Sequence, residues 1–111
     1  MLNQFSRTQL LLGKEAMDKL KNSRVAVFGI GGVGGYVCEA LVRSGVGHFD
    51  LIDDDKVCLT NLNRQIIATR KTVGQYKIDV MKERMLDINP DIEIYVYKCL
   101  FMCYFLIKEE R

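Results

Sequence analysis

The sequence predicts an α/β domain with a mostly parallel sheet, on three observations. Residues 24–28 form an apolar run that leads directly into a glycine-rich loop, and an amphipathic helical pattern follows that loop. A second apolar run covers residues 48–52, and residues 92–97 alternate apolar and polar side chains. A strand, a glycine loop, a helix and a second strand within about 30 residues form a parallel crossover unit, which predicts a right-handed connection.

Each element has its own sequence signal. Residues 6–21 are predicted to be helical, with Gly13 dividing them into two pieces. The strand at 24–28 is nearly all apolar, as expected for a parallel strand covered on both faces. Apolar residues then recur at helical spacing until Gly45 ends the helix. A further helix is predicted over residues 74–88, because an Asn-Pro pair follows it and proline disfavours helix at the residue before it.

The chain is short for such a fold. Its 111 residues allow one small domain, and 49% apolar with 27% charged residues is typical of a globular protein. We expect residues 1–98 to be the N-terminal part of a larger, apparently truncated domain. Residues 99–111 form an atypical tail, in which the apolar run from Cys99 to Ile107 has no helical or strand alternation. We expect either a buried fourth strand there or a chain end produced by truncation or a change of reading frame.

The net charge and the lengths of the apolar runs indicate which kinds of partner and location to expect for the protein. A net charge of +2 makes no strong electrostatic case for a nucleic-acid partner, although a local patch would suffice for a tRNA substrate. The first residues lack the layout of a secretory signal, and no apolar run approaches the roughly 20 residues of a membrane-spanning helix. We therefore expect a cytoplasmic protein with reduced cysteines and no membrane partner. The four cysteines and one histidine lack zinc-site spacing, so no metal ligands are predicted.

The glycine loop is the first candidate site. Its fingerprint places Gly29, Gly31 and Gly34 between the strand and the helix, with Gly32 inside it. Glycines allow a tight turn and a close approach of the backbone to phosphate oxygens, and the helix N-terminus attracts the anion. Phosphate binding therefore explains the loop better than a merely structural turn does. The loop is not a P-loop, because no Gly-Lys-Ser/Thr run follows.

Polar residues after the second strand form the second candidate site. Asp53 ends that strand, where a carboxylate typically accepts hydrogen bonds from ribose hydroxyls. Asn61, Arg64 and Gln65 lie about one helical turn apart, so they can present polar groups on one face. Arg64 offers a planar fork for phosphate oxygens, and Lys77, in the next helix, offers a point charge. Together these groups indicate a triphosphate rather than a dinucleotide.

The motifs together resemble the ubiquitin-activating-enzyme-like superfamily of adenylating enzymes, which includes ThiF, MoeB and HesA. The resemblance extends from Ser6 to about Lys98. It is based on the glycine loop, Asp53-x-Asp55-x-Val57, Asn61-Leu62-Asn63-Arg64-Gln65 and Gly74-x-x-Lys77. Within the superfamily, the chain is most similar to the tRNA threonylcarbamoyladenosine dehydratases. That similarity is carried by Ser6-Arg7-Thr8 with Leu12-Gly13, Asp55-x-Val57-Cys58-x-Thr60-Asn61 and Ile88-Asn89-Pro90.

The resemblance implies a Rossmann-like three-layer domain that adenylates a carboxylate with ATP and Mg²⁺. The nucleotide-binding positions that it implies are Gly29, Gly31, Gly32, Gly34, Asp53, Asp55, Asn61, Arg64, Gln65 and Lys77. The catalytic positions that it implies are Arg64, Lys77 and Arg7. Arg7 matches the N-terminal arginine that family members insert into the site of a neighbouring subunit, which implies a homodimer.

The implied reaction joins a carboxylate to the α-phosphorus of ATP and releases pyrophosphate. In the dehydratases the activated threonyl carboxylate of the tRNA then cyclises and AMP leaves, whereas in the sulfur-carrier activators the carboxylate is a protein C-terminus. In the family an aspartate on a later strand binds Mg²⁺. That strand lies beyond the resemblance, so we expect the chain alone to be inactive.

Two further interpretations remain open. An NAD(P)-binding oxidoreductase domain would explain the glycine loop and Asp53, but not Lys77 or the Asn-Leu-Asn-Arg-Gln run. Alternatively, the chain is a non-enzymatic truncated product that keeps only part of a nucleotide site, an interpretation that the apolar tail favours.

Overall fold

A parallel sheet of three strands forms the centre of the protein. The structure, a computed structural model, describes residues 2–99. Its strands are β1 (Arg24–Phe28), β2 (His48–Ile52) and β3 (Glu93–Tyr97), in the spatial order β1-β2-β3. Both neighbouring pairs are parallel and in register from the first residue to the last. The three predicted strands and their parallel arrangement are therefore confirmed.

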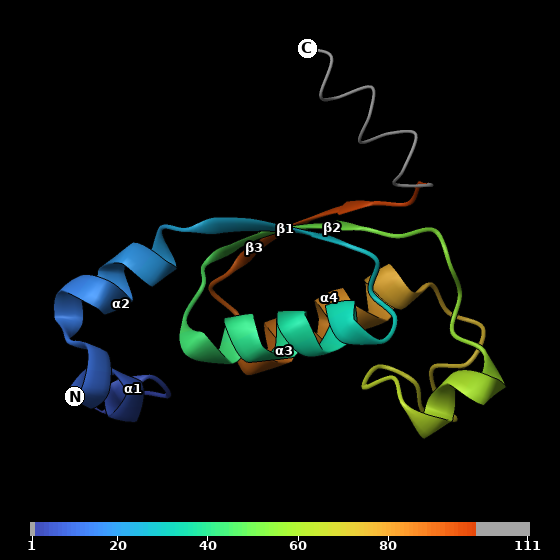
Figure 1. Ribbon diagram of the computed structural model, residues 1–111, viewed down its shortest axis with the longest axis horizontal. Coiled ribbons are helices and arrows are strands. Elements are labelled where there is room, and N and C mark those ends of the chain that lie inside the picture. Colours follow the sequence, from blue (N-terminus) through green and yellow to red (C-terminus); the bar gives the residue numbers. More distant parts are fainter. Residues whose placement is uncertain (1, 100–111) are drawn as a thin grey trace, which may run out of the picture.

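Two long helices make the crossovers between the strands. The helices α3 (Val33–Ser44) and α4 (Lys77–Ile88) lie on the same face of the sheet (Figure 1). Right-handed crossovers in a sheet of order 1-2-3 place every connecting helix on one face, which explains this arrangement. Residues 2–99 thus supply two of the three layers that the resemblance implies.

Two short helices precede the sheet. The helices α1 (Ser6–Leu12) and α2 (Lys14–Lys21) lie beyond the amino ends of the strands, to the left in Figure 1. They are separated at Gly13, which has a φ of 88°, as the sequence predicted. The lack of a side chain at Gly47 allows the end of α2 to pack closely against the segment before β2. A β-carbon at this position would lie 2.0 Å from the carbonyl oxygen of Lys21.

The hydrophobic core fills the space between the sheet and the two long helices. Alternate strand residues such as Val27, Phe49 and Leu51 are buried against this layer. The helices contribute further core side chains, which include Cys38, Val42, Ile78, Met81 and Met85. Glu39 joins the helices at the surface, because its carboxylate accepts hydrogen bonds from Arg84 at 2.6 Å and from Arg43 at 2.7 Å.

The opposite face of the sheet differs from the prediction of a strand covered on both sides. Arg24, Ala26 and Phe28 are exposed, because both crossover helices lie on the other face. Arg24 donates two hydrogen bonds to Asp50, at 2.7 and 2.8 Å. Its guanidinium also lies 4.8 Å from the centroid of the Tyr95 ring, so this face is partly polar.

The helix predicted over residues 74–88 begins later, at Lys77. Gly74 has a φ of 91° and its N–H donates to Val57, so the backbone there is a turn. Tyr76 pairs with Lys56 in an antiparallel bridge and has an extended conformation. These pairings hold residues 74–76 out of the helix. The loop before them contains a short 3₁₀ helix, η1 (Leu59–Asn63).

Two other expectations concern membranes and the tail. None of the helices within residues 2–99 is both long enough and apolar enough to cross a lipid bilayer. The tail predicted over residues 99–111 lies outside the described residues except for Cys99, so the expectations for it stay predictions.

Candidate nucleotide-binding site

Three segments meet where the parallel strands end. The glycine loop leaves β1, a polar loop leaves β2, and α4 begins after that loop, all at the right of Figure 1. The strands are extended into these loops by backbone hydrogen bonds, since Gly29 donates to Ile52 and Asp53 donates to Tyr97. The carboxyl edge of a parallel sheet at the point where loops diverge is where nucleotides bind in open α/β folds.

The glycine loop has a conformation that requires glycine. Gly29 and Gly32 have φ values of 89° and 54°, which L-amino acids with side chains rarely adopt. A β-carbon on Gly34 would lie only 1.7 Å from the carbonyl oxygen of Gly29. A β-carbon on Gly35 would lie 2.8 Å from the carbonyl oxygen of Ile30. Gly35 is thus a further required glycine, which the fingerprint alone does not identify although a glycine pair is visible in the sequence.

Asp53 connects the two loops. Its side chain is buried, and Oδ2 accepts a hydrogen bond of 2.7 Å from the backbone N–H of Ile30. Oδ1 accepts a second hydrogen bond of 2.7 Å, from the backbone N–H of Asp55. The carboxylate therefore fixes the glycine loop against the loop after β2. Each oxygen keeps a second lone pair, so the ribose contact stays a prediction.

Gln65 and Lys77 converge on Gly31. Each of the two residues is only 8% exposed, although both side chains are polar. Lys77 Nζ and Gln65 Nε2 both lie 3.0 Å from the point where a β-carbon of Gly31 would stand. A buried ammonium and a buried amide thus flank the backbone of the glycine loop. We call Gly31, Gln65 and Lys77 the cradle.

Two other predicted phosphate ligands, Asn61 and Arg64, form hydrogen bonds within their own loop. Asn61 is buried, and its Oδ1 accepts a hydrogen bond of 2.8 Å from the backbone N–H of Cys58, which caps η1. Arg64 is exposed, and its Nη1 donates to Thr60 at 3.3 Å and to Asn63 at 2.9 Å. Of the three residues predicted to share one face, Asn61 and Gln65 are buried, whereas Arg64 is exposed.

Asp55 completes the charged groups at this edge. Its Oδ2 lies 3.9 Å from Lys77 Nζ, and 71% of its side chain is exposed. Carboxylate oxygens of Asp53, Asp54 and Asp55 all lie within 4.8 Å of one another. This cluster contains the oxygen type that divalent cations prefer, but both oxygens of Asp53 already accept backbone N–H groups.

Arg7 and the cradle of the same chain lie at opposite ends of the strands. It is exposed on α1, beyond the amino ends of the strands, whereas the cradle lies at their carboxyl ends (Figure 1). The arrangement of residues 2–99 therefore does not bring Arg7 together with the other predicted site residues.

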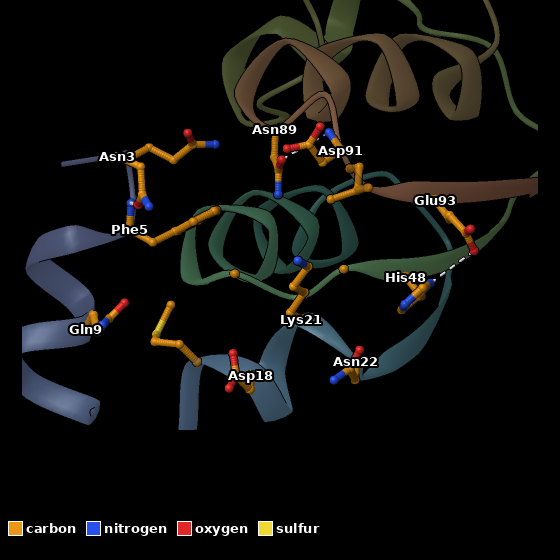
Figure 2. A pocket seen from close by; sticks show the side chains of 15 residues that line it. Asn3, Phe5, Gln9, Asp18, Lys21, Asn22, His48, Asn89, Asp91 and Glu93 are labelled. Carbon is orange, nitrogen blue, oxygen red and sulfur yellow. Dashed lines mark hydrogen bonds and ion pairs between the residues drawn. The ribbon is translucent and has the colours of Figure 1, made fainter. Parts of the chain in front are cut away.

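A second cavity lies at the amino edge of the sheet. It encloses about 510 Å³ between α1, α2 and the segment that joins α4 to β3 (Figure 2). Its labelled side chains include Phe5, Lys21 and Asp91, and His48 Nδ1 lies 3.1 Å from Glu93 Oε2. This cavity is separated from the glycine loop by the length of the strands, so it is not part of the cradle.

Comparison with known proteins establishes the family. The sequence profile of the ThiF family matches residues 5–102, which is most of the chain. The chain belongs to the ThiF family. Among its relatives, the tRNA threonylcarbamoyladenosine dehydratase of Bacillus subtilis is 54% identical over 101 residues, which are 91% of this chain and 40% of that protein. The sulfur carrier protein adenylyltransferase of Thermus thermophilus is 35% identical over 98 residues, or 86% and 36% of the two proteins.

A solved structure confirms the fold. The crystal structure of Escherichia coli TcdA, a tRNA N6-threonylcarbamoyladenosine dehydratase, in complex with ATP matches with a TM-score of 0.86 at 44% identity. The match covers 87% of this chain and 40% of that chain. The Rossmann-like α/β fold is therefore confirmed for this ThiF-family chain. The chain spans about 40% of the length of these two dehydratases.

Proposed function

We propose that this chain forms the ATP-binding part of a tRNA threonylcarbamoyladenosine dehydratase. The observation that carries the proposal is the convergence of two buried polar side chains, Gln65 and Lys77, on Gly31 of the glycine loop. Burying an ammonium without an anionic partner costs free energy. An ionised phosphate oxygen would offset that cost by accepting a charge-assisted hydrogen bond from the ammonium. The B. subtilis relative with 54% identity and the ATP complex of E. coli TcdA support the choice of nucleotide and of reaction.

The residues of this chain act on the phosphates of ATP. The backbone N–H groups of the glycine loop and the N-terminus of α3 attract the anion, and Asp53 keeps that loop in place through Ile30. As a carboxylate oxygen bonds to the α-phosphorus and the bond to pyrophosphate breaks, negative charge develops on the leaving group. Lys77 is buried, so water screens its ammonium little, and it stabilises that charge. The resulting acyl-adenylate then cyclises and releases AMP.

Mg²⁺ would neutralise further phosphate charge, but the acidic cluster at this edge is not suited to be its ligand set. One lone pair of each Asp53 oxygen is used by a backbone N–H group, and the ammonium of Lys77 lies 3.9 Å from Asp55, so it would repel a cation bound by these carboxylates. We propose instead that the aspartate that binds this ion lies in the part of the relatives that this chain does not span.

The positions of Arg7 and the cradle support a homodimer. Arg7 is exposed at the opposite end of its own chain, so a cradle that uses this arginine must receive it from a second subunit. We propose that the dimer acts in the cytoplasm, where its tRNA substrate is located. The isolated chain should bind ATP but convert little of it, because the proposed Mg²⁺ ligand lies in the part of the relatives that this chain does not span.

The sulfur-carrier adenylyltransferase is the second candidate. It uses the same adenylation step, and the T. thermophilus relative is 35% identical. The two functions differ in the carboxylate that they activate, so the substrates distinguish them. An NAD(P)-dependent oxidoreductase is less well supported, because it needs neither Gln65 nor Lys77 beside the glycine loop.

Calorimetric titration of the purified chain with ATP and with NAD⁺ tests the proposal. We expect binding of ATP that is weakened more than tenfold when Lys77 is replaced by methionine, and much weaker binding of NAD⁺. Tighter binding of NAD⁺ than of ATP would contradict the proposed function. For the reaction, an intact relative that carries residues 5–98 of this chain should form AMP with threonylcarbamoyl-modified tRNA and not with a sulfur-carrier protein.

A further inference from the structure

Gln65 combines deep burial with an unused hydrogen-bonding atom. It is only 8% exposed, and its carboxamide oxygen Oε1 has no hydrogen-bond partner within the described part of the chain. Buried acceptors in folded proteins are nearly always paired, because an unpaired one loses its hydration without compensation. The oxygen therefore indicates a state in which a donor reaches it.

Lys77 is a donor with unused capacity beside this amide. Its Nζ lies 3.0 Å from the position of a β-carbon on Gly31, and Gln65 Oε1 lies 3.2 Å from the same point. The ion pair of Lys77 with Asp55 is long, at 3.9 Å, and 71% of the Asp55 side chain is exposed. Water screens such a pair strongly. An ammonium carries three N–H donors, so it can serve a phosphate and a second acceptor at once.

The chemistry of a phosphate ligand assigns different roles to the two ends of the Gln65 amide. Ionised phosphate oxygens only accept hydrogen bonds, so they can pair with Nε2 but not with Oε1. We infer that Gln65 is a positioning residue, whose Oε1 accepts a hydrogen bond from the Lys77 ammonium while its Nε2 donates to the same phosphate. The inference rests on the proposed function, because it requires a polyphosphate in the cradle.

A neutral amide suits this task better than a carboxylate does. Glutamate at position 65 would hold the ammonium more strongly, but it would cancel the charge of Lys77 and repel the phosphate. Glutamine directs the ammonium and leaves its charge for the ligand. The pair therefore acts as one unit, in which Gln65 contributes mainly through Lys77.

A double-mutant cycle on the full chain tests this coupling. Calorimetry with ATP would be performed on the wild type, Gln65→Met, Lys77→Met and the double variant. We expect Gln65→Met to weaken ATP binding about tenfold, as for a hydrogen bond to a charged group, and Lys77→Met to weaken it more. The double variant should lose clearly less affinity than the sum of the two single losses, because in Lys77→Met the Gln65 amide has no ammonium left to position. Additive losses would overturn the inference.

Two further variants keep the test decisive. Gln9→Met makes the same substitution at an exposed position on α1 and should leave ATP binding unchanged. Gln65→Glu keeps the size and polarity of the side chain, so it tests the role of Gln65 in ATP binding even if Gln65→Met does not fold. We expect Gln65→Glu to bind ATP at least tenfold more weakly, as for a like charge beside the phosphate, and wild-type affinity would overturn the inference. A wild-type chain that binds no ATP would instead overturn the proposed function itself.

Discussion

The carboxylate of Asp53 accepts a hydrogen bond of 2.7 Å from the backbone N–H of Ile30, across 23 residues of sequence. This bond joins the end of β2 to the glycine loop, and the second oxygen of Asp53 holds the backbone of Asp55. One buried side chain thus fixes the two loops of the candidate nucleotide site relative to each other.

Replacing Asp53 by asparagine should weaken both the fold and ATP binding. The amide keeps one acceptor but turns an NH₂ group toward the other backbone N–H, so we expect a loss of about 2–3 kcal/mol in unfolding free energy. Urea unfolding and ATP titration measure the two effects. Asp54→Asn is the matched control, because Asp54 is exposed, and it should change neither quantity by much. Unchanged ATP affinity in Asp53→Asn would count against a role of Asp53 in the site.

Alanine at two glycines should separate folding from binding. In Gly34→Ala the new β-carbon meets backbone at 1.7 Å, so we expect a loss of about 4 kcal/mol or more in stability. In Gly31→Ala it meets only the flexible ends of Gln65 and Lys77, at 3.0 Å. We expect that variant to lose no more than about 1 kcal/mol in stability. Its ATP affinity should nevertheless fall about tenfold, because the cradle is displaced. A stable Gly34→Ala variant, in a thermal melt, would show that the loop differs from the one described.

The stability that the hydrogen bonds of Glu39 add between α3 and α4 should depend on pH. Hydrogen bonds from Arg84, and then from Arg43, hold the pKa of Glu39 below its ordinary value. A carboxyl whose pKa is lower in the folded state adds stability above its unfolded pKa of about 4.3, and this stability is lost as the pH falls through the folded pKa. Because Arg84 and Arg43 are substantially exposed, we expect Glu39→Gln to cost only about 0.5–1 kcal/mol at pH 7.

Urea unfolding of Glu39→Gln at pH 7 and pH 3 checks this expectation. The difference from wild type should shrink at the lower pH, where the wild-type carboxyl also takes up a proton. Glu83→Gln, on the exposed side of α4, serves as the control and should show little difference at either pH. A destabilisation of Glu39→Gln that is equal at both pH values would mean that packing, not charge, explains it.

Arg7 should act across a subunit interface. In an intact relative that carries residues 5–98 of this chain, subunits with Arg7→Ala and subunits with Lys77→Met should each be nearly inactive. Mixing them should restore some AMP formation, because one of the two hybrid sites would be whole. If verified heterodimers recover no activity, Arg7 acts within its own subunit or has no role in the reaction.

The sheet and the loop could be predicted from the sequence because their signals are local. Apolar runs define the three strands, and the glycine fingerprint identifies the candidate phosphate loop from residues that are neighbours in sequence. The start of α4 could not be predicted, because the bridge between Lys56 and Tyr76 joins residues far apart in sequence. That bridge, together with the left-handed turn at Gly74, delays the helix until Lys77.

The cradle shows the same limit. The sequence predicts Asn61, Arg64, Gln65 and Lys77 as one polar group, but not which of them meet. Asn61 caps its own 3₁₀ helix and Arg64 hydrogen-bonds to its own loop, whereas Gln65 and Lys77 are directed to Gly31 by the path of the whole segment between β2 and α4. Such convergence depends on tertiary structure, which no local pattern encodes.

The most direct test of ATP binding by the cradle is a nuclear magnetic resonance titration of the ¹⁵N-labelled chain with ATP. We expect the largest shifts in the backbone amides of Gly31–Gly34 and in the side-chain amide of Gln65. Adenosine, which lacks phosphates, should leave the Gln65 side-chain signal nearly unchanged. Shifts confined to the cavity at the amino edge, around His48 and Glu93 (Figure 2), would show that ATP does not bind at the cradle.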